Sequence, residues 1–330
     1  MMDYTPVFIH AWWRSSSTYV WSKLRKDDSL CCYYEPLNER IAKLDKDSAD
    51  ALLSVEDSAR LKHPSQGRSY FAEYFEFAAA SVRAYQPEFA YDRYLLRQGD
   101  EHPALQSYLR GLLTSAAEAG RRPVLSFCRS QMRSAWIKQQ FGGLHVAQIR
   151  NPVSQWQSFQ VDPYFVLKMM LIGLNLWSDC PQAFAHIPGF VRHGAAVREG
   201  SEFARSKFTL GWDDAQRLFL LLWLASCIQS VAQADFVLDV DRLAIDPGYR
   251  QTTSEWLASV GCRAEFSDCS TPGARGLPRD EALQAAIDEA ICAIRLHAAC
   301  LLHADAKAVL HRLSQLTSVT ATILERAAST

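Results

Sequence analysis

The chain has 330 residues, of which 48% are hydrophobic and 22% charged, a composition typical of a soluble protein with one large or two average domains. Its 35 Lys and Arg residues against 36 Asp and Glu residues give a formal net charge of −1, which excludes the overall basic surface of a nonspecific nucleic-acid binder. Any anion site must therefore be local, and nucleic acid is not an expected partner.

Targeting and cysteine patterns favour an intracellular enzyme. The N-terminal stretch has no basic segment followed by a long apolar one, so no secretory signal is expected. The apolar run 218–228 has about half the length of a bilayer span, so we expect no membrane span and a cytoplasmic location. The nine cysteines form no C-x-x-C pair, which favours buried reduced thiols over zinc or redox sites.

Four runs rich in Val, Ile, Phe and Leu are predicted to be buried strands, at 7–13, 124–128, 145–150 and 236–243. Segments with helical periodicity separate them, which indicates an α/β fold with a mainly parallel sheet and flanking helices. Residues 42–120 are polar and poor in strands, and we interpret them as a helical insertion or lid. The stretch 281–330 is predicted to form C-terminal helices. No repeat or linker divides the chain, so 1–330 is expected to be a single domain.

An arginine and a run of hydroxyl side chains follow the first predicted strand: Arg14, Ser15, Ser16, Ser17 and Thr18. A helix that begins here presents unpaired N–H groups and the positive end of its dipole, which together favour an anion. Arg14 adds a forked cation suited to phosphate or sulfate. The alternative is a serine-rich helix cap beside a surface arginine.

A second motif, in residues 146–159, joins a strand that ends in Arg-Asn-Pro to a helix. Arg150 and Ser158 are eight residues apart, so an arginine at the strand end and a serine about two turns into the helix can converge on one phosphate. The Walker A pattern G-x-x-x-x-G-K-[ST] is absent.

These two motifs resemble those of sulfotransferases that use 3′-phosphoadenosine-5′-phosphosulfate (PAPS). In that family a basic residue and Ser-Gly-Thr-Thr or Ser-Gly-Ser-Thr hold the 5′-phosphosulfate, and here Ser16 stands at the glycine. The resemblance implies a P-loop NTPase-like sulfotransferase fold, with Arg150 and Ser158 on the 3′-phosphate, Tyr19 near the adenine and Arg275 in a late loop that touches the 3′-phosphate. Residues 236–262 also resemble a late strand and helix of the family, so the likeness spans about 7–262.

The same resemblance implies the catalytic groups. Arg14 would stabilise the leaving phosphate oxygen, and Glu35, in a segment like the Glu-Pro segment of glycan and tyrosylprotein sulfotransferases, would act as base. The Lys-Thr-His version of the chemistry is absent from 124–134. Glu35 could instead pair with an arginine or cap a helix. Arg129 and Arg133 either face substrate or cofactor, or are surface residues.

The function so predicted is transfer of a sulfuryl group by in-line displacement from PAPS to an acceptor hydroxyl, or to an amine, of a small molecule, glycan or peptide, with no metal required. One alternative is a nucleotide-dependent kinase of the P-loop class. Another is a nucleotide-binding or scaffold protein that kept the fold without the chemistry. His10 and His145 are expected to be core or surface histidines.

Overall fold

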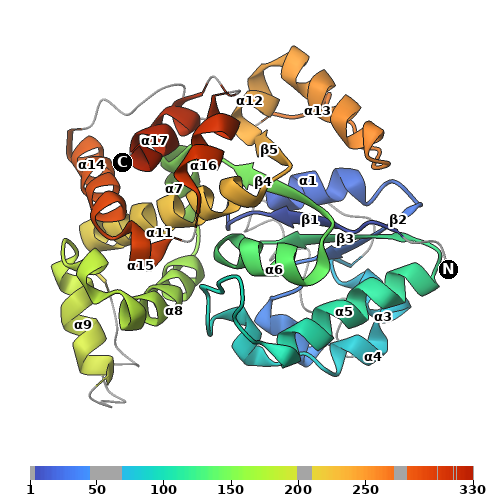
Figure 1. The fold of residues 1–330 in the computed structure, drawn as a ribbon, viewed down its shortest axis with the longest axis horizontal. Coiled ribbons are helices and arrows are strands. Elements are labelled where there is room, and N and C mark those ends of the chain that lie inside the picture. The colour runs from blue at the N-terminus through green and yellow to red at the C-terminus, as the bar shows by residue number, and fades with distance from the viewer. Residues whose placement is uncertain are drawn as a thin grey trace.

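The computed structural model describes residues 4–44, 69–198, 210–270, 281–302, 304–314, 316 and 318–329. Five parallel strands form one sheet in the order β2-β3-β1-β4-β5, with helices on both faces (Figure 1). The class is therefore α/β, as predicted. The strands are β1 (Val7–His10), β2 (Leu30–Tyr34), β3 (Arg122–Phe127), β4 (Leu144–Ile149) and β5 (Phe236–Asp239).

Two strands end earlier than the apolar runs predicted. β1 stops at His10 because the chain turns before the next helix, and beyond it Trp12 makes only an isolated bridge to Arg129. The second half of the predicted strand 236–243 is wrong, since a helix starts at Val240. The Asp239 side chain accepts hydrogen bonds from the next free N–H groups, which caps that helix and ends the strand.

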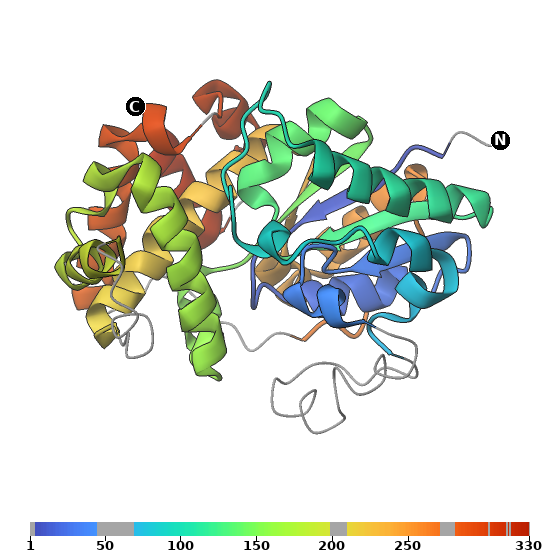
Figure 2. The same ribbon diagram turned by 90° about the horizontal axis from the view of Figure 1, so that it is seen from below.

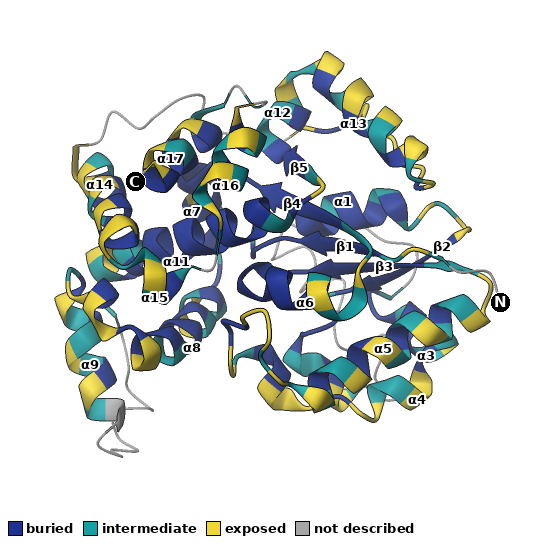
Figure 3. Ribbon diagram, viewed as in Figure 1, coloured by how far each residue is buried: buried dark blue, intermediate teal, exposed yellow. Residues whose placement is uncertain are grey.

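The two faces of the sheet carry different helices. Tyr34 and Ile9 point to one face, where the Trp21 ring of α1 lies 4.7 Å from the Tyr34 ring. Phe8 points to the opposite face, where the Phe141 ring of α6 lies 6.1 Å away. Figure 1 shows α1 on one side of the strands and α5 and α6 on the other, and Figure 3 shows the strands themselves buried between them.

Helices make up most of the rest of the described chain, and the segments 163–198, 212–233 and 281–328 gather beside the sheet (Figure 2). The α-helices are α1 (Ser17–Leu24), α3 (Ala72–Phe77), α4 (Ala79–Val82), α5 (Pro103–Glu118), α6 (Ser134–Phe141), α7 (Pro152–Phe159), α8 (Pro163–Asp179), α9 (Pro188–Arg198), α11 (Trp212–Gln233), α12 (Val240–Ile245), α13 (Pro247–Ser259), α14 (Glu281–Leu296), α15 (Ala298–Leu301), α16 (Ala306–Leu313) and α17 (Val319–Ala328). The 3₁₀-helices are η1 (Glu39–Lys43), η3 (Pro87–Ala90), η4 (Gln131–Arg133) and η5 (Pro181–Phe184).

The described part of the 42–120 segment contributes to the core. Leu105, Leu109 and Leu112 of α5 are fully buried in the same cluster as β1, β2 and β3. The Tyr108 hydroxyl donates to the Pro36 carbonyl at 2.9 Å, which ties α5 to the loop after β2. α5 is thus part of the layer that covers the sheet.

α11 lies at the centre of a second cluster of buried hydrophobic residues, distinct from the one that contains α5. Among the described helices it is the one long and apolar enough to cross a membrane, and 89% of its most apolar window is buried inside the protein. Such burial is also typical of a core helix, which is how the run 218–228 was interpreted from sequence.

Two cysteines differ from the expectation of reduced thiols. Cys180, after α8, and Cys300, in α15, form a disulfide with their Cα atoms 5.9 Å apart. The bond joins positions 120 residues apart in sequence, and no spacing pattern indicated it. The remaining seven cysteines are free, and six of them are buried.

Candidate functional site

The predicted site residues meet at the carboxyl edge of the sheet. In spatial order along this edge, the loops after the strands carry Glu35, Arg129, Arg14, Arg150 and Asp241. After β1 the chain runs towards β2 on one side, and after β4 it runs towards β5 on the other, so β1 and β4 flank a topological switch point. In open parallel sheets ligands bind outside the carboxyl ends of the strands at such a point.

Four successive carbonyls of the loop between β1 and α1, those of residues 12–15, are hydrogen-bonded to buried side chains, one of which is Ser15 of the loop itself. The pairs are Trp12 with Ser15 Oγ (2.6 Å), Trp13 with Gln155 Nε2 (2.6 Å), Arg14 with Arg150 Nη1 (2.6 Å) and Ser15 with Gln148 Nε2 (2.6 Å). The loop is therefore fixed from beneath, with its negative dipole ends turned away from the open side.

In contrast to these carbonyls, the backbone amides that follow are unpaired in the described part of the chain. Within the described residues, the N–H groups of Ser16, Ser17 and Thr18 have no hydrogen-bond acceptor. Arg14 and Ser16 have φ values of 63° and 64°, the left-handed backbone that lets neighbouring N–H groups converge. Three free amides at the start of α1 make a site for an anion. Ser16 thus takes a backbone conformation that glycine adopts more readily than serine.

The hydroxyls of the loop have partners within the protein. Ser15 is fully buried and donates to its own loop, while Thr18 Oγ1 lies 2.6 Å from the Tyr34 hydroxyl. Ser17 Oγ lies 3.1 Å from the Cys128 sulfur. The backbone amides, more than these side chains, are thus the donors on the open side.

Arg14, Arg150 and Ser158 come together from two motifs that are 144 positions apart. Arg14 Nε donates to Ser158 Oγ at 2.9 Å and to its carbonyl at 3.1 Å, and the Arg14 guanidinium lies over the Phe165 ring. Burial lowers the pKa of Arg14, and so does the charge of Arg150, but arginine remains protonated in proteins. Two cations this close favour an anion between or beside them.

Arg150 is 6% exposed, and its Nε has no hydrogen-bond partner among the described residues. Burial lowers its pKa, and Asp241, in the first turn of α12, acts to raise it. Asp241 itself accepts a hydrogen bond from the Asn151 amide at 2.5 Å and holds the start of α7. An unpaired buried arginine donor beside the switch point is a binding group for an oxyanion.

Glu35 lies directly after β2, with a left-handed φ of 46° and its amide bonded to the Ser126 carbonyl. Its Oε2 accepts from Asn38 Nδ2 at 2.9 Å and lies 3.3 Å from Arg129 Nη1. Pairing with an arginine, the alternative stated from sequence, is therefore present. The preceding residue, Tyr34, contacts Thr18, at the end of residues 14–18, which we call the anion loop.

The other predicted residues have different outcomes. Arg129 and Arg133 are fully buried, so their interpretation as surface residues is wrong. Arg133 donates to the carbonyls of the loop around η3 and has a structural role. Tyr19 donates to Asp268 at 2.7 Å with its ring beside Phe266. Arg275 lies outside the described residues.

Sequence reasoning missed the residues that shape the loop from below. Gln148 and Gln155 lie in a buried strand and on a buried helix face, and each reaches a loop carbonyl. The available signal was a glutamine inside an apolar run, because a buried amide needs a hydrogen-bond partner. Neither Cys128 nor Tyr34 was predicted to be a site residue, although they contact the hydroxyls of Ser17 and Thr18.

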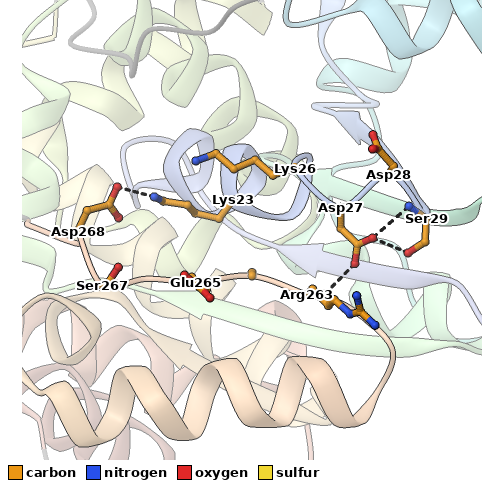
Figure 4. A pocket seen from close by; sticks show the side chains of 10 residues that line it. Lys23, Lys26, Asp27, Asp28, Ser29, Arg263, Glu265, Ser267 and Asp268 are labelled. Carbon is orange, nitrogen blue, oxygen red and sulfur yellow. Dashed lines mark hydrogen bonds and ion pairs between the residues drawn. The ribbon is translucent and has the colours of Figure 1, made fainter.

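A pocket of about 660 Å³ opens elsewhere, at the C-terminal end of α1 (Figure 4). Its Asp268 pairs with Lys23 at 2.5 Å, and its Asp27 accepts from Ser29 and from the Arg263 amide. None of the predicted site residues lines this pocket, and these carboxylates are already paired.

Comparison of the chain with protein-family models, with curated proteins and with solved structures found no match. The functional interpretation therefore depends on the residues and the geometry at the carboxyl edge of the sheet.

Proposed function

We propose that the protein is a PAPS-dependent sulfotransferase with a P-loop NTPase-like sulfotransferase fold. The observation that carries this proposal is the convergence of the two motifs at the switch point. Arg14 bonds Ser158, and Arg150 bonds the Arg14 carbonyl, although the motifs were recognised independently in the sequence. Both motifs lie at the sheet edge outside the carboxyl ends of the strands, where ligands bind in open parallel sheets.

The donor set fits a nucleotide with phosphate groups at two positions. The free amides of residues 16–18 and the guanidinium of Arg14 would hold the 5′-phosphosulfate. Arg150, with its unpartnered buried Nε, and Ser158 would hold the 3′-phosphate. Tyr19, and Arg275 outside the described residues, complete the cofactor set that the resemblance implies.

The chain's own residues then have two tasks. As the acceptor oxygen bonds to sulfur and the bond from sulfur to the 5′-phosphate oxygen breaks, Arg14 and the loop amides stabilise the charge on the leaving oxygen. Glu35 accepts the acceptor's proton. The acceptor is a hydroxyl or amine of a small molecule, glycan or peptide. A cytoplasmic location stays a prediction from the sequence. The Cys180–Cys300 disulfide does not support that location, since oxidising compartments favour disulfides.

Calorimetric binding of 3′-phosphoadenosine-5′-phosphate (PAP), the desulfated product, tests the cofactor. We expect wild type to bind PAP more tightly than ATP or AMP, and Arg150→Ala to weaken PAP by about 10-fold to 100-fold, the effect of losing a charged hydrogen bond. Arg242→Ala is the matched control, because Arg242 follows β5 at the same edge but pairs with Asp246. Binding that ignores the 3′-phosphate, or equal losses in both variants, would contradict the proposal.

Turnover of labelled PAPS with a panel of hydroxyl and amine acceptors tests the reaction. Glu35→Gln should leave PAP affinity within about twofold and lower turnover by at least about 100-fold, the scale of losing a general base. A P-loop kinase would instead need ATP and magnesium, so transfer that continues in chelator separates the two enzymes. PAP binding with no transfer to any acceptor would favour the nucleotide-binding scaffold.

A further inference from the structure

We propose that Arg129 is a positioning residue that holds the Glu35 carboxylate against the anion loop and leaves one carboxylate oxygen available for the acceptor proton. This inference rests on the proposed function. Arg129 follows β3, the strand between β2 with Glu35 and β1 with Arg14. It is 1% exposed, so it acts from beneath the site and is not a surface contact.

The guanidinium of Arg129 joins the loop after β2 to η1 and to α8. Nη1 lies 3.3 Å from Glu35 Oε2 and donates to the Leu37 carbonyl at 3.0 Å. Nη2 lies 2.9 Å from Glu39 Oε2 and donates to the Tyr164 hydroxyl of α8 at 3.1 Å. Arg129 is thus ion-paired with both carboxylates, while its hydrogen bonds to the Leu37 carbonyl and the Tyr164 hydroxyl fix the orientation of the guanidinium.

The contacts on Glu35 select one of its two oxygens. Arg129 and Asn38 both contact Oε2, at 3.3 and 2.9 Å, whereas Oε1 has no hydrogen-bond donor among the described residues. The Glu35 side chain is 12% exposed, so the carboxylate still reaches the open side of the site. Oε1 is therefore the oxygen that is placed to accept a proton.

Glu39 shares Arg129 but is not a second base. Burial acts to raise the pKa of Glu39, but Arg129 and hydrogen bonds from tyrosines outweigh burial and lower it to about 2. Glu39 is also bonded by Tyr164 at 2.8 Å and paired with Lys168 at 3.1 Å. Its role is to balance the charge of Arg129, which leaves Glu35 as the carboxylate that faces the reaction.

Arg129 also sets the distance between the base and the anion loop. Its guanidinium lies 5.0 Å from the centre of the Trp13 ring, and its backbone pairs with Trp12. Trp13 precedes Arg14 directly. One buried side chain thus contacts both the carboxylate and the loop that would hold the phosphosulfate, and displacement by about 1 Å between such groups costs about 100-fold in rate.

The test is a double-mutant cycle over wild type, Arg129→Lys, Glu35→Gln and the double variant. PAPS turnover, the KM for PAPS and PAP affinity are measured for each protein, together with the urea unfolding equilibrium. Arg133→Lys is the matched control, because Arg133 is equally buried four positions along but bonds only backbone carbonyls. Lysine keeps the charge at position 129 and removes the fork.

We expect Arg129→Lys to lower kcat at least about 10-fold, while the KM for PAPS and the affinity for PAP stay within about twofold. In the Glu35→Gln protein the same substitution should change kcat less than about twofold. Arg133→Lys should leave kcat within about twofold. An undiminished loss from Arg129→Lys in the Glu35→Gln background would overturn the positioning role. Equal effects on PAP affinity and kcat would also overturn it.

The unfolding measurements test the interaction between Arg129 and Glu35 independently of cofactor binding and turnover. If PAP does not bind wild type, the proposed function fails. The four unfolding constants still report whether the two side chains interact, and coupling of at least about fivefold is expected for a buried pair. Additive effects on unfolding would show that Arg129 does not hold Glu35, and would overturn the inference whatever the reaction.

Discussion

A chain of buried histidines predicts that acid weakens the fold in a defined pH window. His145 Nε2 lies 2.8 Å from the Gly142 carbonyl, which can only accept, so this nitrogen carries the proton. His145 Nδ1 must then accept from His10 Nε2 at 2.9 Å, and His10 Nδ1 must accept from Ser130 Oγ at 2.7 Å. Burial lowers the pKa of both imidazoles, so both rings are neutral in this arrangement.

The magnitude follows from the pKa of His145. Burial lowers this pKa from its ordinary value of 6.5 to about 4, with Lys138 acting in the same direction. Below pH 6.5 the unfolded chain binds a proton that the folded protein does not, so the free energy of unfolding falls as the pH falls. Between about pH 7.5 and about pH 5 the loss from His145 alone is about 2 kcal/mol, and it reaches about 3 kcal/mol near pH 4. His10, whose pKa is also lowered by burial, acts in the same sense.

Urea unfolding at about pH 7.5 and about pH 5 measures this loss. His145→Phe keeps a ring beside Phe8, which lies 5.0 Å from the imidazole, and removes the titrating group. The variant should be less stable at neutral pH but should lose about 2 kcal/mol less than wild type on acidification. His311→Phe, at an exposed position of α16, is the control and should leave the pH dependence unchanged. A His145→Phe variant with the full wild-type slope would refute the assignment.

Three other changes test the loop and the disulfide. The free energy of unfolding of Ser16→Gly should stay within about 1 kcal/mol of wild type. Ser16→Val should be about 2 kcal/mol less stable than the Ser16→Gly variant, since a β-branched residue resists the left-handed backbone. Equal melting curves for the two variants would contradict that conformation. Gln148→Leu should lower the free energy of unfolding in urea by about 1–3 kcal/mol, because it leaves the Ser15 carbonyl without its hydrogen-bond donor. It should also weaken PAP binding at least about fivefold. A fully stable variant would mean that the carbonyl finds another donor. Cys180→Ser, or reduction of wild type, should lower the unfolding free energy by roughly 2–4 kcal/mol, and an identical midpoint with and without reductant would show that the Cys180–Cys300 bond is not formed.

The sheet could be predicted from the sequence because its strands are buried on both faces. Such strands are continuous apolar runs, and all four predicted runs contain a strand. Their ends were less predictable, since an end depends on local hydrogen bonds. Asp239 caps α12 within a run that remains apolar, so composition alone did not show where β5 stops.

The residue types of the site could be predicted from the sequence, but the buried side chains that hold these residues in place could not. Parallel strands place their carboxyl ends on one edge, which is why residues that follow β1 and β4, such as Arg14 and Arg150, lie close together. Which side chains hold them there depends on contacts over long sequence distances. Arg129, for example, reaches Leu37 across 92 positions, and neither periodicity nor a motif distinguishes that arginine from an exposed one.

The serine at position 16 shows why a glycine is not indispensable in a loop of this kind. A non-glycine residue in the left-handed region costs about 1–2 kcal/mol. Each of the four inward carbonyl hydrogen bonds contributes about 1 kcal/mol net, and their donors are buried side chains already fixed by the core. The supporting bonds therefore outweigh the strain at Ser16, and the free amides stay aligned without glycine. A search that requires glycine at this position would miss an anion loop that is held by its surroundings.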